Sequence, residues 1–276
     1  MPAVFNSPHS GQLMPQSLLR LTQLSPAQLR QSEDSYVDLL FSGCLNNGAP
    51  LLRALASRSY LDLNREPFEL DQRMFAECLP GYMNPGSPRV AAGLGTLPRI
   101  VGDDIEIYRA KIPLSEAFDR IESFYKPYHR TLVDLLQKAE AAAGFVLLVD
   151  CHSMPTTARQ TLNAKRPDVV LGDRFGRSTS PEISNAIEAF FSSQGLRVVR
   201  NKPYAGGFIT ETYGAPQQHR HAVQLEISRG LYMDERTFAP LANFAKLQET
   251  LTLFSAHLNE IIMEYHHAGD LRRAAE

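Results

Sequence analysis

Two histidines stand just after short apolar segments that have the composition of β-strands. Phe145–Val149 is a continuous aliphatic run that ends at Asp150 and His152, and Ala3–Phe5 leads into a turn-forming segment that contains His9. Open α/β sheets bind ligands beyond the carboxyl ends of their strands, so both imidazoles stand where chemistry is expected. For His152 the alternative is a loop histidine that a neighbouring carboxylate satisfies.

Carboxylates that could join these histidines stand at two places in the chain. If residues 34–41 are helical, Asp34 and Asp38 lie four residues apart on one face, among apolar neighbours. Glu226 projects from the polar side of a predicted strand over Ala222–Ser228. Two imidazoles, one carboxylate and an open position for water are the ligand set of a catalytic zinc, and a further glutamate would act as general base. The spacing alone only suggests this and does not choose between the two aspartates.

Serines beside the histidines invite a serine-nucleophile mechanism. Ser10 follows His9, and Ser153 follows His152. Neither serine lies in a G-x-S-x-G elbow. Each is better interpreted as a hydrogen-bond partner that orients the neighbouring imidazole.

The composition limits the partners that the chain can have. Its 276 residues are 43% hydrophobic with a net charge of −2, so a sizeable core is expected and a basic surface for nucleic acid is not. No apolar run approaches the length of a membrane span, and the amino terminus lacks a signal-peptide pattern. The cysteines at positions 44, 78 and 151 are widely spaced, which suits a reducing compartment. We expect a cytoplasmic protein with a small-molecule partner, no nucleic acid and no membrane.

Strands and helices are predicted to alternate along the chain. Further strands are expected over Asp168–Leu171 and Leu196–Asn201, and helices over Leu114–Ala143, with a kink at Lys126-Pro127, over Pro181–Gln194 and over residues 238–265. The segment Ser57–Arg65 alternates in the manner of a strand, and residues 78–104 form a long excursion that a lid or specificity loop would explain. This order predicts an α/β fold in which a mixed, largely parallel sheet carries helices on both faces.

Short motifs from about residue 8 to residue 235 follow one another in the order of a known family. They are Pro8-His9-Ser10-Gly11, Ser57-Arg58, Asp62-Leu63-Asn64-Arg65, Tyr125 with Pro127-Tyr128-His129, Asp150 with His152-Ser153, Gly206-Gly207 with Ile209-Thr210, Tyr213-Gly214, and His221-Ala222-Val223-Gln224-Leu225-Glu226. Together they resemble the N-formylglutamate amidohydrolase family, whose members are also called N-formylglutamate deformylases.

The resemblance implies a single-domain zinc hydrolase with a three-layer fold related to zinc carboxypeptidases and aspartoacylases. Those relatives bind zinc through a histidine and a glutamate three residues later, but here Gln12 is the third residue after His9, so the carboxylate must come from elsewhere. Asp34 matches an aspartate of the family, and with His9 and His152 it would bind Zn²⁺ or another divalent metal. Glu226 is similar in placement to the carboxypeptidase general base.

The resemblance also implies substrate contacts from one arginine segment. Asn64 and Arg65 belong to a segment like the one with which aspartoacylases hold a substrate carboxylate, and a planar guanidinium suits that task. The alternative for Arg65 is a structural salt bridge to Glu66 or Asp62.

A second group of implied substrate contacts contains two departures from the family pattern. Gly207 and Thr210 are expected to bind substrate, and the family carries a histidine at the position of Phe208 and an arginine at the position of Glu211. An arginine there would suit a dicarboxylic substrate, whereas Glu211 near the pocket would repel a second carboxylate.

The implied reaction is hydrolysis of the amide bond of an N-formyl amino acid, foremost of N-formyl-L-glutamate to formate and L-glutamate, in histidine degradation. The whole chain, residues 1–276, is then expected to form one domain. One alternative is a zinc amidohydrolase that acts on a different N-acyl amino acid or peptide. The other is a non-catalytic zinc-binding or ligand-binding protein, which would give no reason for a carboxylate at Glu226.

Overall fold

The computed structural model describes residues 1–102, 104–158 and 165–273. The chain divides into two compact units. The first, here called the sheet unit, comprises Met1–Ser7, Tyr36–Leu52 and Asp134–Glu276, and the second, here called the loop-rich unit, comprises Pro8–Ser35 and Arg53–Val133. That the chain is one domain stays a prediction.

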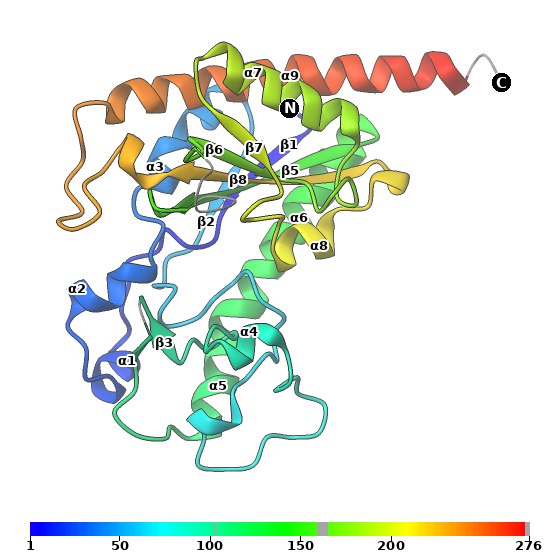
Figure 1. Cartoon of the computed structure of the whole chain (residues 1–276). Coiled ribbons are helices and arrows are strands. Elements are labelled where there is room, and N and C mark those ends of the chain that lie inside the picture. Colours follow the sequence, from blue (N-terminus) through cyan, green and yellow to red (C-terminus); the bar gives the residue numbers. More distant parts are fainter. Residues whose placement is uncertain (103, 159–164, 274–276) are drawn as a thin grey trace. The chain divides into compact units, whose positions relative to one another are not determined.

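A six-stranded sheet with the strand order β2-β1-β5-β8-β6-β7 forms the centre of the sheet unit (Figure 1). Its strands are β1 (Ala3–Ser7), β2 (Leu51–Arg53), β5 (Val146–Met154), β6 (Val169–Gly172), β7 (Val198–Arg200) and β8 (Arg220–Ser228). The pairs β1–β5, β5–β8 and β6–β7 are parallel, and β6 runs antiparallel to β8. This mixed, largely parallel sheet confirms the predicted α/β class.

The two long central strands separate an apolar face from a polar face. On β8, Val223, Leu225 and Ile227 belong to the hydrophobic core, whereas Gln224 and Glu226 alternate with them and point to the opposite face. On β5, the core residues are those at positions 147, 149 and 151, so the residues at 150 and 152 share the face of Glu226. The sheet therefore collects polar side chains from neighbouring strands on one face.

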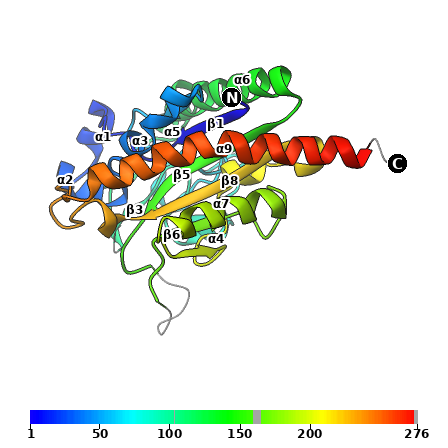
Figure 2. The same cartoon turned by 90° about the horizontal axis from the view of Figure 1, so that it is seen from above.

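Helices cover both faces of this sheet, as predicted. On the apolar face lie α3 (Val37–Leu40), α7 (Pro181–Ser193) and α9 (Phe244–Arg273), and Figure 2 shows α7 and α9 side by side over the strands. On the polar face lies α8 (Phe208–Tyr213), and Gly207, the residue before it, donates a hydrogen bond to Gln224 of β8. The start of α7 follows from its sequence, because Ser180 caps the N–H of Ile183 and proline occupies the first helical position.

The loop-rich unit contains short elements between long connections. They are α1 (Gln16–Leu21), α2 (Pro26–Leu29), α4 (Pro88–Ala91), α5 (Leu114–Arg120) and the antiparallel pair β3 (Ile100–Val101) and β4 (Ile105–Glu106). Short 3₁₀-helices occupy Arg30–Ser32, Ser42–Asn47, Gln72–Met74, Pro216–Gln218 and Arg229–Leu231 across the two units. The long predicted helix is present as α5, a π-helical turn over Ile121–Tyr125, and α6 (Lys126–Ala143), which continues into the sheet unit. The π-helical turn directly precedes Lys126-Pro127, and the kink expected at those two residues stays a prediction.

Two local predictions were wrong. The segment Ser57–Arg65 forms turns and bends instead of a strand. Asp34 lies outside any helix, because Tyr36 has a left-handed φ of 67° and α3 begins only at Val37. Asp34 and Asp38 therefore do not share a helical face.

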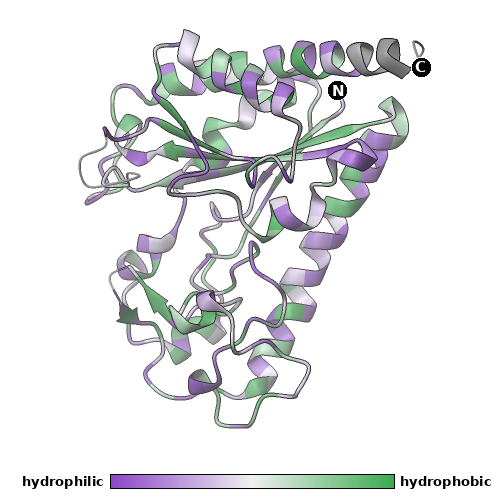
Figure 3. Ribbon diagram, turned by 45° about the vertical axis from the view of Figure 1, so that its right-hand side comes forward, coloured by the Kyte–Doolittle hydropathy of each residue, from purple (hydrophilic) through white to green (hydrophobic). Residues whose placement is uncertain are grey.

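Hydropathy follows this architecture (Figure 3). The strands of the six-stranded sheet are mainly apolar, and α6 alternates between apolar and polar residues along its length, as expected for elements that bury one side. Among the described residues, no helix combines the length and the apolar character that a membrane span requires.

Candidate functional site

In the loop-rich unit, His9 lies between two buried aspartates. Its Nδ1 is 3.4 Å from Oδ2 of Asp34, and its Nε2 is 2.7 Å from Oδ1 of Asp62. The backbone N–H of Asp34 also donates to the carbonyl oxygen of His9 at 3.0 Å. Because an ionised carboxylate only accepts, the proton on Nε2 is assigned from this contact with Asp62. The predicted pair His9 and Asp34 thus lies together.

Two arginines keep Asp62 ionised. Burial alone would raise the pKa of this carboxyl, but the guanidinium groups of Arg58 and Arg65, together with His9, hold the pKa well below its usual range. Arg58 Nε donates to Oδ2 of Asp62 at 3.0 Å, and Arg65 approaches the same oxygen at 3.4 Å. Asp62 also accepts the backbone N–H of Asn64 at 2.9 Å. A buried carboxylate with these partners is a strong and fixed acceptor for the imidazole.

Arg65 is held by groups of its own unit. Besides Asp62, its Nε donates to the carbonyl oxygen of Leu94 and one terminal nitrogen donates to that of Asn64, both at 2.8 Å. The alternative of a structural salt bridge to Asp62 is therefore observed. The role of Asn64 and Arg65 in binding substrate stays a prediction.

In the sheet unit, His152 has a carboxylate partner of the same kind. Its Nε2 lies 2.9 Å from Oδ2 of Asp150, and the other oxygen of Asp150 accepts from Nδ2 of Asn6 at 2.7 Å. The simpler alternative for His152, a neighbouring carboxylate, is thus present. A carboxylate on Nε2 fixes the orientation of the ring, as it does in many metal-binding histidines. That His9, Asp34 and His152 bind one metal stays a prediction, because they belong to two units.

Glu226 stands opposite His152 on the polar face of the sheet. The two residues are in register on the paired strands β8 and β5, and the Glu226 side chain is buried. Gln224 Nε2 donates to Oε1 of Glu226 at 2.8 Å. Ser153 accepts a hydrogen bond from Nε of Arg229 at 3.1 Å, so this serine interacts with a cation that the sequence analysis did not single out.

The predicted residues around α8 form a compact corner of the sheet unit. The N–H of Gly207 donates to Oε1 of Gln224 at 2.8 Å, and the hydroxyl of Thr210 donates to the carbonyl oxygen of Gly207 at 3.0 Å. Glu211, whose side chain is about half exposed, pairs with Arg174 at 2.7 Å. The negative charge of Glu211 therefore has a local counter-ion.

Three residues that contact the predicted site were not among the site residues predicted from the sequence: Asp62, Asp150 and Gln224. For Asp150 and Gln224 the sequence contained a local signal. Each stands two positions before a predicted site residue and hence on the same face of its strand. For Asp62 no such signal existed, since it contacts His9 across 53 positions of the chain.

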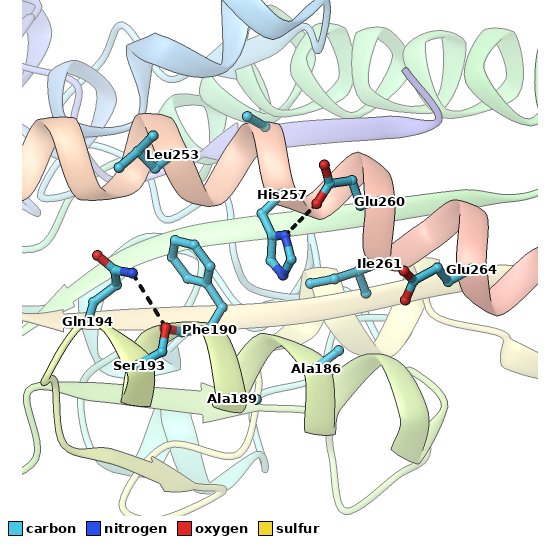
Figure 4. Close-up of a pocket in the computed structure, with 11 residues that line it drawn as sticks. Ala186, Ala189, Phe190, Ser193, Gln194, Leu253, His257, Glu260, Ile261 and Glu264 are labelled. Atoms are coloured by element: carbon cyan, nitrogen blue, oxygen red, sulfur yellow. Dashed lines mark hydrogen bonds and ion pairs between the residues drawn. The ribbon is translucent and has the colours of Figure 1, made fainter.

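A surface groove lies between α7 and α9 of the sheet unit (Figure 4). It measures about 650 Å³, and its lining includes Ala186, Phe190, His257 and Ile261. Its lining residues do not include a predicted site residue, and α7 and α9 lie on the apolar face of the sheet. The predicted residues His152 and Glu226 of the sheet unit lie instead on the polar face.

Known proteins resemble the chain over nearly its full length. The sequence pattern of the family described as N-formylglutamate amidohydrolase matches residues 1–233. An N-formylglutamate deformylase from Pseudomonas aeruginosa is 30% identical and covers 96% of this chain and 94% of its own, and one from Pseudomonas putida is 28% identical and covers 85% and 83%.

Solved structures agree with this similarity. The crystal structure of N-formylglutamate amidohydrolase from Ralstonia eutropha JMP134 matches with a TM-score of 0.90 at 32% identity, over 96% of this chain and 95% of that one. A gene product from Agrobacterium tumefaciens, at 18% identity and a TM-score of 0.61 over 96% and 92% of the two chains, shares the fold. By sequence and by fold, the chain belongs to the N-formylglutamate amidohydrolase family.

Proposed function

We propose that this protein is a divalent-metal-dependent hydrolase that releases formate from N-formyl-L-glutamate. The family and the names of its Pseudomonas relatives support the reaction. The proposal that the reaction depends on a divalent metal rests on one observation. In both His9 and His152 a buried carboxylate engages Nε2, which is the arrangement that fixes a metal-binding imidazole with its other nitrogen toward the ion.

His9, Asp34 and His152 are the proposed ligands. Imidazole and carboxylate donors suit zinc, and three protein ligands leave a position for water. Chain length supports the combination, because Asn6 is in register with Asp150 and His9 follows Asn6 by three residues, which span at most about 11 Å. The similarity to zinc carboxypeptidases is part of this proposal.

The bound metal would supply a polarised water with a lowered pKa. Glu226 takes one proton from the attacking water, whose oxygen forms the new bond to the formyl carbon. When the carbon–nitrogen bond breaks, Glu226 returns the proton to the amine, so formate and glutamate leave. Asp62 and Asp150 keep the rings of His9 and His152 in one tautomer and one orientation throughout.

The substrate carboxylates would contact the loops that carry the remaining predicted residues. Asn64 and Arg65 are proposed to hold the α-carboxylate, and Gly207 and Thr210 are proposed to border the rest of the substrate. A cytoplasmic location and a place in histidine degradation stay predictions.

A different N-formyl or N-acyl amino acid is the second candidate substrate. Glu211 supports it, since a carboxylate at this position disfavours a dicarboxylic ligand. The pairing of Glu211 with Arg174 reduces that repulsion, which is why we place N-formyl-L-glutamate first.

Formate release from a panel of substrates tests the proposal. The panel contains N-formyl derivatives of glutamate, a neutral and a basic amino acid, together with N-acetylglutamate. We expect the highest kcat/KM for N-formyl-L-glutamate, and we expect Glu226→Gln to lower kcat by about 10²- to 10⁴-fold with metal content unchanged. Glu249→Gln, on the exposed side of α9, is the matched control. Full turnover by Glu226→Gln, or no formate from any N-formyl substrate, would contradict the proposal.

A further inference from the structure

Gln224 connects Glu226 to the loop that begins α8. Its Nε2 donates to Oε1 of Glu226, and its Oε1 accepts the backbone N–H of Gly207, each at 2.8 Å. Because a backbone N–H only donates, the amide oxygen must face Gly207, and the amino group must then face Glu226. The buried side chain therefore has one orientation in which both hydrogen bonds form.

Gly172 leaves the space in which this loop approaches the sheet. Gly172 on β6 is in register with Gln224 on β8. A Cβ atom at position 172 would lie 2.8 Å from the backbone carbon of Ala205 and from the nitrogen of Gly206, which is closer than side chains approach. The absence of a side chain thus lets the loop pack beside Gln224 and present the N–H of Gly207 to it.

We propose that Gln224 is the positioning residue of the general base, an inference that rests on the role proposed above for Glu226. Gln224 holds one oxygen of the Glu226 carboxylate and so sets the plane in which the group exchanges a proton with water and amine. Because the same amide binds Gly207, it also fixes the spacing between the base and a loop that we propose to contact substrate. When a base is held in one orientation, a larger fraction of its conformations can react than when it is mobile.

Two substitutions separate the two hydrogen bonds. Gln224→Glu can still accept from Gly207 but, when ionised, cannot donate to Glu226, so kcat should fall by about 10- to 100-fold with KM nearly unchanged. Gln224→Met loses both bonds, so kcat should fall and KM should rise as the loop is released. Ser228→Ala, on the same face of β8, is the matched control and should keep wild-type kcat.

Amide hydrogen exchange at Gly207 gives a readout that needs neither metal nor substrate. Measured by NMR on metal-free protein, exchange should be slow in wild type and in Gln224→Glu, and faster in Gln224→Met. Thermal unfolding of each variant shows whether the fold is kept.

The inference is overturned if folded Gln224→Glu and Gln224→Met both turn over at the wild-type rate, or if Ser228→Ala loses as much activity as they do. It is also overturned if Gln224→Glu lowers kcat by the same factor in a Glu226→Gln background as in the wild-type protein. An effect that acts through Glu226 should largely vanish in that background. If Glu226→Gln is inactive and the Gln224 variants are fully active, only this inference fails. If Glu226→Gln is itself fully active, the proposed function fails, and the inference fails with it.

Discussion

Nε2 of His9 lies 2.7 Å from Oδ1 of Asp62, and both side chains are about 2% exposed. This contact assigns a proton to Nε2, because the nitrogen that faces an ionised Asp62 must carry one. The arginines beside Asp62 keep its carboxyl ionised and therefore able to accept that proton-bearing nitrogen.

Asp62→Asn should weaken metal binding by about 10- to 100-fold, since the amide removes the charge that fixes the ring and raises its basicity. Competition with a chromophoric chelator would measure the affinity. Asp71→Asn is the matched control, because Asp71 also pairs with two arginines in the loop-rich unit, Arg73 and Arg99, but lies outside the proposed ligand set. Equal affinity of Asp62→Asn and wild type would remove Asp62 from the site.

The environment of His221 should make the free energy of unfolding depend on pH. Its Nδ1 accepts from the N–H of Ser180 at 3.3 Å, and in the described part of the chain its buried Nε2 has no hydrogen-bond partner. Burial, followed by the charge of His219, lowers the pKa of His221 from 6.5 to about 4. Between these values the unfolded chain binds more protons than the native protein, so the free energy of unfolding falls as the pH drops from 6.5 toward 4.

Replacing His221 by Gln should flatten that slope, because the amide does not titrate in this range. The lowered pKa corresponds to a loss of about 3 kcal/mol over the interval. Urea unfolding at several pH values would measure it, and His257→Gln, at a half-exposed position of α9, should retain the slope. An identical slope in His221→Gln and wild type would contradict the prediction.

Phe254 should be essential for the attachment of α9. Its ring is fully buried and packs on Phe191 at 4.8 Å and on Phe190 at 5.5 Å between centroids. Phe254→Ala should lower the free energy of unfolding by about 3–5 kcal/mol through the cavity it creates. Leu253→Ala, at the adjacent but half-exposed position, should change it by less than about 0.5 kcal/mol. Similar losses in the two variants, measured by denaturant unfolding, would show that α9 packs differently.

Substitution at Glu211 tests the origin of substrate preference. Glu211→Arg should shift the ratio of kcat/KM for N-formylglutamate over a neutral N-formyl amino acid by about two- to fivefold toward the acidic substrate, the range for an exposed charge. Arg174, which loses its partner, adds to the effect. A constant ratio would mean that Glu211 points away from the substrate.

The sheet and one face of the site could be predicted from the sequence because their signals are local. The run Phe145–Val149 lies in and next to β5. The alternation over Ala222–Ser228 correctly predicted that Glu226 lies on the opposite face of the strand from Val223, Leu225 and Ile227. Period-two alternation and apolar runs indicate which side of a strand is buried, and the burial observed in β5 and β8 agrees with both signals.

The segment around Asp62 could not be predicted in the same way. Leu61 and Leu63 alternate with polar residues, as in a strand, but Asp62 is satisfied by Arg58, Arg65 and a histidine 53 positions away. Long-range ion pairs of this kind leave no periodic signal. The bond from Gln224 to Gly207 was hidden for the same reason, since it depends on how a loop packs against the sheet.

Zinc-dependent formate release tests the metal-dependent reaction most directly. The protein is stripped with a chelator, zinc is added back in steps, and formate from N-formyl-L-glutamate and bound zinc are measured on the same samples. We predict that formate release rises with bound zinc and saturates near about one ion per chain, and that His152→Gln abolishes both binding and release. Formate release by metal-free protein at the rate of the untreated enzyme would contradict the metal-dependent mechanism.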